Sequence, residues 1–475
     1  MPSAADTAAD QKAIAADPAM VSLYEAHQKI YPRSVSGLFS HWRWAFVWLT
    51  QLVFYGLPWL DWGQRQAVLF DLGARRFYIF NLVLYPQDFI YLTGILVISA
   101  LSLFLFTAVA GRLWCGYACP QTVYTEIFLW IEKKFEGDRS ARMRRDNGPF
   151  SLDKFVRKGG KHLAWLAVAL WTGFTFVGYF TPITQLGSEL IQLRMGSWEV
   201  FWTGFYGFAT YGNAGFMREQ VCKHMCPYAR FQSAMFDHDT LIVTYDQQRG
   251  EPRGARSRKA DPTQLNLGAC VDCTLCVQVC PTGIDIRNGL QYECIGCGAC
   301  ADVCNTVMDK MGYARGLVKY STQNAVQQNW SGPEILRHVL RPRVLLYSAI
   351  LLAVVVAMLV SLVLRSPFKV DVVRDRGTLA RIVSGGNIEN VFRLQVMNAT
   401  ESDQVYRMSV SGLEGLALAS DAQFNVDSTQ SRWIAVRVQL PYEAARPGSH
   451  PIQFEIVQQG NDKHVSEKSV FLVPR

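Results

Sequence analysis

Residues 270–304 read CVDCTLCVQVCPTGIDIRNGLQYECIGCGACADVC, and this stretch holds eight of the twelve cysteines in the chain. The cysteines form two consecutive runs with the same spacing, C-x2-C-x2-C-x3-C. Two-cluster bacterial ferredoxins have this doubled run, because each 4Fe-4S cluster takes three thiolates from one run and the fourth from the end of the other. The spacing therefore predicts a two-cluster ferredoxin-like α+β domain that neither run would form alone.

The crossing of the two runs divides the eight cysteines into two predicted ligand sets. The first set is Cys270, Cys273, Cys276 and Cys304, and the second is Cys280, Cys294, Cys297 and Cys300. A zinc ribbon is the alternative, but a zinc site needs only four ligands, so the doubled run favours iron and sulfide. Asn305 stands where a proline usually follows the second run. Proline shapes the turn and donates no ligand, so we expect both clusters to form.

The chain of 475 residues is long enough for two or three domains, and half of its residues are apolar. Its mean hydropathy of +0.07 hides strong segregation, because some windows of about twenty residues carry no charge. These windows predict an α-helical transmembrane bundle of about five spans. The expected spans are residues 44–60, 89–110, 163–183, 200–216 and 344–364. The first is short and rich in tryptophan, so an interfacial helix is its alternative.

Lysine and arginine positions predict how the bundle is oriented. Residues 112–162 hold eleven of them, and by the positive-inside rule this loop is cytoplasmic. The N-terminus and the cysteine-rich region then also lie in the cytoplasm, where thiols stay reduced. Beside a membrane, a basic loop favours anionic lipid over nucleic acid as its partner. Residues 1–28 are polar and alanine-rich and lack the pattern of a signal peptide, so we expect a disordered cytoplasmic tail.

The C-terminal region changes character, with apolar and polar residues alternating in segments such as 392–396, 433–438 and 452–456. Turn-rich segments separate these runs, which predicts an immunoglobulin-like β-sandwich of about seven strands on the periplasmic side. The region contains no cysteine, and nothing in it suggests catalysis. The predicted organisation is a tail (1–40), four spans with the basic loop (41–217), the ferredoxin-like domain (218–343), a fifth span (344–364) and the sandwich (365–475).

The remaining four cysteines form two C-x3-C-P motifs, Cys115–Pro120 and Cys222–Pro227. Each motif follows a predicted span and has an arginine shortly before it, Arg112 or Arg218, which suggests an internal repeat. Cysteines four residues apart share one face of a helix. We therefore expect Cys115, Cys119, Cys222 and Cys226 to bring four thiolates together at the membrane surface.

Three interpretations of this second cysteine set remain open. The first is a soft-metal site for Cu(I), with His224 and Met225 as further candidate ligands. The second is a third iron–sulfur cluster or a dithiol/disulfide relay. The third is a set of buried structural cysteines, which the repetition of the whole motif disfavours. His224 by itself also fits a solvated histidine at the interface.

The order of these features resembles the cytochrome c oxidase accessory protein family CcoG, also called FixG or RdxA. The resemblance extends from about Pro32 to the C-terminus. It implies a role in assembling cbb(3)-type haem-copper oxidases and the reduction of Cu(II) to Cu(I) on the cytoplasmic side of the bacterial inner membrane. It also implies that the eight cysteines of residues 270–304 bind clusters, and that the four C-x3-C-P cysteines form the copper or electron-exit site.

The expected function is one-electron transfer from a soluble cytoplasmic donor, through two clusters, to thiolate-bound copper. The chain has no G-x-G-x-x-G motif after a strand, so the electrons must come from a partner protein. Further expected partners are a copper transporter, a copper chaperone, oxidase assembly factors and a second copy of the chain. The rival functions are a quinol-linked polyferredoxin of anaerobic respiration and a redox-silent copper chaperone or scaffold.

Overall fold

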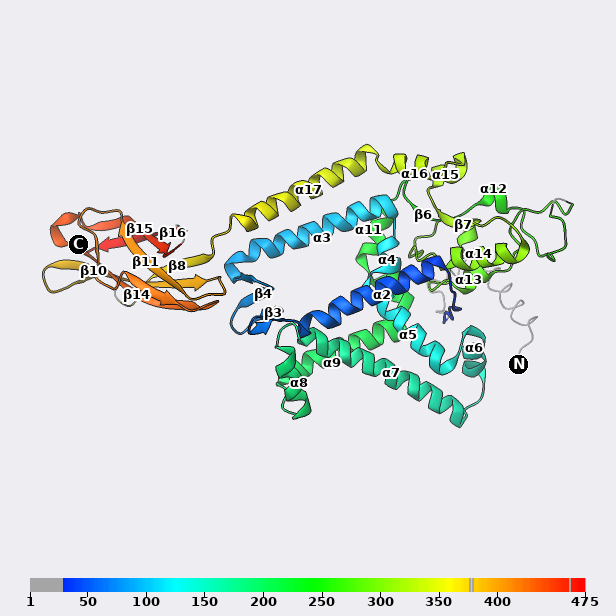
Figure 1. Ribbon diagram of the computed structural model, residues 1–475, viewed down its shortest axis with the longest axis horizontal. Coiled ribbons are helices and arrows are strands. Elements are labelled where there is room, and N and C mark those ends of the chain that lie inside the picture. The colour runs from blue at the N-terminus through cyan, green and yellow to red at the C-terminus, as the bar shows by residue number, and fades with distance from the viewer. Residues whose placement is uncertain (1–28, 263, 376, 378–379, 461–462, 475) are drawn as a thin grey trace, which may run out of the picture.

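The computed structural model describes residues 29–262, 264–375, 377, 380–460 and 463–474. The molecule is elongated, with the C-terminal strands at one end and the cysteine-rich segment at the other (Figure 1). Two long helices, α3 (Phe89–Ala110) and α17 (Pro342–Val363), lie side by side between these ends. At 1.5 Å per residue, each of these 22-residue helices is ~33 Å long, which matches the hydrocarbon core of a bilayer.

Two helices in the described part of the chain are long and apolar enough to cross a membrane. They are Pro86–Ala110 and α17, and only 6% of each apolar window is buried within the molecule. Their apolar side chains therefore face outward, as contact with lipid would require. The other expected spans also form helices, α2 (Leu38–Gly56), α7 (Leu152–Val177) and α9 (Ser197–Gly212), but none meets the same test. The five-span bundle therefore stays a prediction.

The bounds of several expected segments differ in the structure. Helix α7 starts at Leu152, well before the predicted residue 163, because the Ser151 side chain caps it by accepting from the backbone N–H of Lys154. Of the predicted disordered tail, residues 1–28 lie outside the described residues. Residues 29–40 are ordered, so the predicted boundary at residue 40 is wrong. The Lys29 and Tyr31 side chains both donate to Asp146 at 2.7 Å, which holds this segment against the basic loop.

Small strands fill the connection between α2 and α3. Strands β3 (Val68–Asp71), β4 (Arg76–Ile79) and β5 (Leu82–Leu84) form an antiparallel sheet, and β1 (Asp61–Trp62) pairs with β2 (Arg65–Gln66). The sheet packs on the C-terminal domain through one shared apolar cluster of Leu69, Tyr78, Val83, Tyr85, Met397 and Ala399. An ion-pair group reinforces this junction, because buried Asp88 lies 2.6 Å from Arg365 and 2.5 Å from Lys369.

The C-terminal domain is a β-sandwich, as the alternating sequence predicts. One sheet has the strand order β12-β14-β10-β8 with β9 beside β10, and the other has the order β13-β11-β15-β16. The described residues thus form nine strands rather than about seven: β8 (Phe368–Arg374), β9 (Arg381–Ile382), β10 (Asn387–Asn398), β11 (Gln404–Ser411), β12 (Ala417–Leu418), β13 (Gln423–Val426), β14 (Ser431–Pro441), β15 (Gly448–Gln458) and β16 (His464–Val473). Alternate residues such as Phe392 and Phe454 fill the interior between the sheets.

Short helices and one strand pair build the cysteine-rich end. Strands β6 (Ile242–Tyr245) and β7 (Val318–Ser321) pair antiparallel and pack near α14 (Ala299–Met311). The other elements of this half are α4 (Leu113–Tyr117), α5 (Pro120–Glu136), α6 (Arg139–Asn147), α10 (Arg218–Gln220), α11 (Pro227–Met235), α12 (Gln247–Gly250), α13 (Leu275–Gln278), α15 (Gln323–Gln328) and α16 (Gly332–Val339). Helix α8 (Ile183–Ile191) lies instead beside Leu57–Trp59, at the other end of α2 (Figure 1). Two π-helical turns, Asn213–Met217 and Val221–Met225, flank α10.

Candidate metal centres

The first group of cysteines, which we name ferredoxin site 1, lies around one small cavity. Cys270, Cys273, Cys276 and Cys304 line this cavity of about 30 Å³, together with apolar side chains such as Leu317. Cys276 belongs to α13 and Cys304 to α14, so the fourth thiol comes from the second cysteine run. This is the grouping that the spacing predicts.

The second group, ferredoxin site 2, lines a neighbouring cavity of about 20 Å³. Cys280, Cys294, Cys297 and Cys300 line it and make up this site, and Cys276 of ferredoxin site 1 also reaches the cavity. Cys300 and Cys304 are four residues apart on α14 and share one face of that helix, so α14 contributes one thiol to each site. Gly296 has a φ of +66°, and this left-handed conformation turns the loop that carries Cys294 and Cys297.

Burial makes the unliganded thiols of both sites weak acids. It raises the pKa of Cys294 and of Cys304 to about 12, and that of Cys276 to about 11. Thiolates in these cavities therefore need a bound cation to offset their charge. Four thiols around an apolar cavity suit a 4Fe-4S cluster, which supplies reversible one-electron chemistry when it is bound.

The number of thiols favours iron–sulfur clusters over a zinc ribbon. A zinc ion in such a ribbon needs four ligands, whereas eight thiols line two neighbouring cavities here. A 4Fe-4S cluster would take one thiolate at each iron, and the two groups of four thiols would serve two clusters.

Asn305 has a structural role in place of the missing proline. Its side-chain oxygen accepts a hydrogen bond of 2.9 Å from the backbone N–H of Gly316. The contact ties the loop that follows α14 back to the helix, next to Cys304. The altered motif therefore leaves the ferredoxin fold intact.

The four C-x3-C-P cysteines also come together, at what we name the paired-motif site. Every pair among Cys115, Cys119, Cys222 and Cys226 lies within electrostatic range. Burial raises the pKa of Cys115 to about 11 and that of Cys222 to about 12. His224 and Met225 are exposed beside these half-buried thiols.

The predicted helical arrangement of these cysteines is wrong. Helix α4 ends at Tyr117, and Cys119 is an extended residue that precedes Pro120, the first residue of α5. Cys226 likewise precedes Pro227 at the start of α11. A residue before proline avoids the helical conformation, so each motif interrupts the helix and places its second cysteine at the junction between two helical segments. The thiols meet across these breaks rather than along one helix face.

The paired-motif site packs directly against ferredoxin site 2. A Cβ atom on Gly116 would lie 2.8 Å from the carbonyl oxygen of Gly296, so only glycine allows this approach. Cys115 and Cys222 pack against the apolar cluster that includes Cys297. Cys276 of ferredoxin site 1 and Cys300 of ferredoxin site 2 line the same cavity, so these two sites are also neighbours. The three cysteine sites therefore form a row.

Comparison with known proteins identifies the family. A model described as a 4Fe-4S dicluster domain matches residues 217–323, one described as a 4Fe-4S binding domain matches residues 92–137, and one described as an IG-like fold at the C-terminus of FixG matches residues 358–474. The chain is 37% identical to the nitrogen fixation protein FixG of Rhizobium meliloti over 436 residues, which cover 85% of this chain and 83% of that protein. The chain belongs to the FixG/RdxA family. It is also 40% identical to protein RdxB of Cereibacter sphaeroides over 406 residues (84% and 85% of the two chains) and 36% identical to protein RdxA of that organism over 439 residues (90% and 92%).

Membership of the FixG/RdxA family, together with the two 4Fe-4S models, confirms the prediction of an iron–sulfur redox protein with an immunoglobulin-like C-terminal domain. The copper site and the individual ligand assignments stay predictions.

The sequence does not predict the roles of two side chains at the paired-motif site, Arg112, which it shows as part of the repeated motif, and Gln232. Arg112 is buried and donates to the backbone carbonyls of Tyr292 and Ala229. Burial raises the pKa values of Cys115, Cys222 and Cys294, and the positive charge of Arg112 offsets part of that rise. Gln232 is fully buried, and its Nε2 lies 3.5 Å from the Cys115 sulfur. The arginine before each motif is a visible signal, but Arg218 instead pairs with Glu132 at 3.0 Å. No sequence signal points to Gln232.

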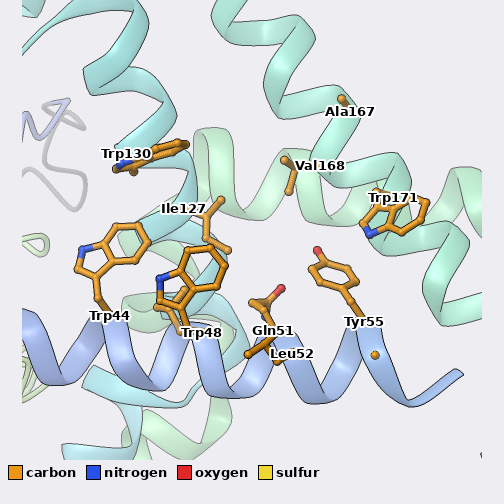
Figure 2. Close-up of a pocket in the computed structure, with 12 residues that line it drawn as sticks. Trp44, Trp48, Gln51, Leu52, Tyr55, Ile127, Trp130, Ala167, Val168 and Trp171 are labelled. Atoms are coloured by element: carbon orange, nitrogen blue, oxygen red, sulfur yellow. The ribbon is translucent and has the colours of Figure 1, made fainter. Parts of the chain in front are cut away.

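An aromatic cavity of about 850 Å³ lies between α2, α5 and α7 (Figure 2). Its walls include the rings of Trp44, Trp48, Trp130 and Trp171. Gln51 and Tyr55 extend from α2 toward the two other helices, and the Tyr55 hydroxyl lies 2.9 Å from the Thr172 hydroxyl. The Gln51 Oε1 atom is buried and has no hydrogen-bond partner within the described residues.

Proposed function

We propose that this protein transfers single electrons from a soluble cytoplasmic donor to Cu(II) and releases Cu(I) at the cytoplasmic face of the membrane. Each donor molecule loses one electron and each Cu(II) ion gains one, so no proton is needed to balance the step. The Cu(I) would serve the assembly of a cbb(3)-type cytochrome c oxidase. The observation that carries the proposal is the row of three cysteine sites, which has an exposed residue at each end.

The donor end of the row is ferredoxin site 1. All twelve cysteines lie in the described part of the chain, and among them Cys273 alone is exposed to solvent. A protein donor can therefore approach this site to within a few ångströms of a ligand sulfur. At ferredoxin site 2 Cys297 is buried, and Cys280, Cys294 and Cys300 are half-buried. The exposed cysteine thus makes ferredoxin site 1 the more accessible of the two sites for a donor.

The acceptor end is the paired-motif site. Met225 is 55% exposed, and the exposed His224 precedes it in the π-helical turn that carries Cys222. Thioether and imidazole groups bind copper, and the soft sulfur favours Cu(I) over Cu(II). A site that stabilises the reduced ion makes Cu(II) easier to reduce. We place copper on this exposed pair, next to the four thiols.

The long axis of the molecule supports the proposed orientation. Helices α3 and α17 hold the cysteine sites at one end and the sandwich at the other, so a membrane around these helices would separate the two (Figure 1). Helices α5 and α6 carry lysine and arginine residues at the cysteine end, which the positive-inside rule assigns to the cytoplasm. The periplasmic sandwich would then be free to dock a copper transporter, an oxidase assembly factor or a second copy of the chain.

A copper-reduction assay tests this function directly. The anaerobically purified protein is reduced with dithionite, freed of excess reductant and mixed with Cu(II) in the presence of a Cu(I)-specific chelator. We expect one Cu(I) for each electron stored and loss of the reduced-cluster EPR signal. The H224A/M225A variant should keep the EPR signal and reduce copper slowly, whereas the control M143A/H464A, which removes an exposed Met and an exposed His elsewhere, should match the parent protein. Reduced clusters that persist after Cu(II) is added would contradict the proposal and favour a redox-silent scaffold.

A second candidate function is quinol-linked electron transfer, which the aromatic cavity favours. Its volume lies in the ordinary range for small-molecule sites, and the unpartnered Gln51 oxygen could accept a hydrogen bond from a quinol hydroxyl. A short-chain quinol should then reduce the clusters in the parent protein, and the Gln51→Leu variant should be reduced more slowly. No reduction of the parent protein by the quinol would remove this candidate.

A further inference from the structure

We propose that Cys115, Cys119, Cys222 and Cys226 hold a third 4Fe-4S cluster. The inference deepens the proposed function, because it rests on electron transfer through the cysteine sites. It holds whether or not Cu(II) is the acceptor. A cluster at this position would extend the row of redox sites to the surface that carries His224 and Met225.

The four thiols form a complete ligand set that no single segment of the chain contains. A 4Fe-4S cluster is held by four cysteine thiolates. The 4Fe-4S binding model that matches residues 92–137 includes only two cysteines, Cys115 and Cys119, so this segment alone leaves a cluster with half of its ligands. The structure supplies the other two: Cys222 packs against the same apolar cluster as Cys115, and Cys226 interacts electrostatically with Cys115 and Cys119.

The number and type of the donors match those of a cluster site. The paired-motif site has four thiols, as each ferredoxin site has, and the ferredoxin sites belong to a 4Fe-4S dicluster domain. A 4Fe-4S binding model also matches the segment that carries Cys115 and Cys119.

The groups around the thiols suit a negatively charged cluster. The backbone N–H groups of Gln121 and Thr122, in the first turn of α5, point at the Cys119 sulfur. The Nε2 atom of Gln232 lies 3.5 Å from the Cys115 sulfur, and the buried Arg112 adds a positive charge. Hydrogen bonds to the ligand sulfurs and the local charge are the means by which proteins set cluster potentials.

The position of the paired-motif site would let a cluster there exchange electrons with ferredoxin site 2. Gly116, between Cys115 and Cys119, packs on the backbone of Gly296 and Cys297 in ferredoxin site 2. A third cluster here would therefore adjoin the second across a single layer of backbone. A disulfide relay would instead need two electrons per turnover, which matches neither one-electron clusters nor the reduction of Cu(II).

The iron content of the intact protein tests the inference without any variant. The full chain, purified anaerobically in detergent, should contain about twelve iron atoms and twelve acid-labile sulfides, as three clusters require. About eight iron atoms and eight sulfides would overturn the proposal. About ten iron atoms, with the Mössbauer spectrum of a 2Fe-2S cluster at the third site, would also overturn it. Because this readout involves no copper, twelve iron atoms without copper reduction would defeat only the proposed acceptor, and eight iron atoms with copper reduction would defeat only the third cluster.

A pair of variants locates the extra iron. The C119A/C226A variant should lose about four iron atoms and keep the EPR signals of the two ferredoxin sites. The matched Cys273→Ala variant should disturb ferredoxin site 1 and leave the signal assigned to the paired-motif site unchanged. If C119A/C226A keeps all of the iron of the parent protein, these cysteines are not cluster ligands and the proposal fails.

Discussion

Replacing Gly116 with alanine would drive a methyl group into the backbone of the loop that carries ferredoxin site 2. The added Cβ would lie 2.8 Å from the carbonyl oxygen of Gly296 and 2.9 Å from the Cα of Cys297. Both are backbone atoms, so they cannot swing aside as a flexible side chain can. The contact must open to about 3.4 Å, which moves α4 and Cys115 away from Cys297.

The loss in free energy of unfolding that this movement causes can be estimated. Overpacking a tight contact costs about 1–3 kcal/mol, and the higher helix propensity of alanine in α4 returns about 1 kcal/mol. The net loss is therefore about 0–2 kcal/mol, which lowers the Tm by up to about 8 °C for a domain of 150–250 residues. We also expect slower reoxidation of the reduced clusters by Cu(II), because the last cysteine site is displaced from the one before it.

Thermal unfolding in detergent and stopped-flow reoxidation measure the two effects. Gly204→Ala is the matched control, since it lies within α9 and a Cβ there would meet nothing within 4 Å. The control should equal the parent protein in both assays, or be slightly more stable. If Gly116→Ala has the Tm and the reoxidation rate of the parent protein, then α4 does not pack on ferredoxin site 2 as described.

Three further predictions concern other contacts. Asp302→Ala removes the carboxylate that accepts from the backbone N–H groups of Phe39 and Ser40 at the start of α2, so we expect a loss of about 1–3 kcal/mol and faster hydrogen exchange there. Iron should be lost to a chelator faster at pH 6 than at pH 8, because the raised thiol pKa values of the ferredoxin sites let protons compete with iron for the sulfurs; equal rates would contradict this. Arg365→Met leaves the buried Asp88 with Lys369 as its one ion-pair partner among the described residues, and should lower the unfolding temperature by an amount that corresponds to up to ~3 kcal/mol.

Features that depend on near neighbours in the chain could be predicted from the sequence. The doubled cysteine run predicts two groups of four thiols, and the structure places them around two cavities. Period-two alternation predicts the sandwich, and the uncharged stretches 89–110 and 344–364 form most of α3 and α17. In each case the residues that decide the outcome lie within a few turns or strands of one another, so spacing alone carries the information.

Other features arise only when distant segments meet. The two C-x3-C-P motifs are more than one hundred residues apart, and their thiols converge because each motif breaks at a proline rather than continuing as a helix. Arg112, Gln232 and the close approach of Gly116 to Gly296 depend on packing between segments that share no local pattern. The family and its iron–sulfur chemistry are therefore determined by the sequence itself. The order of the cysteine sites and the surroundings of the last one are decided by tertiary structure, because contact energies between remote residues leave no periodic trace in the chain.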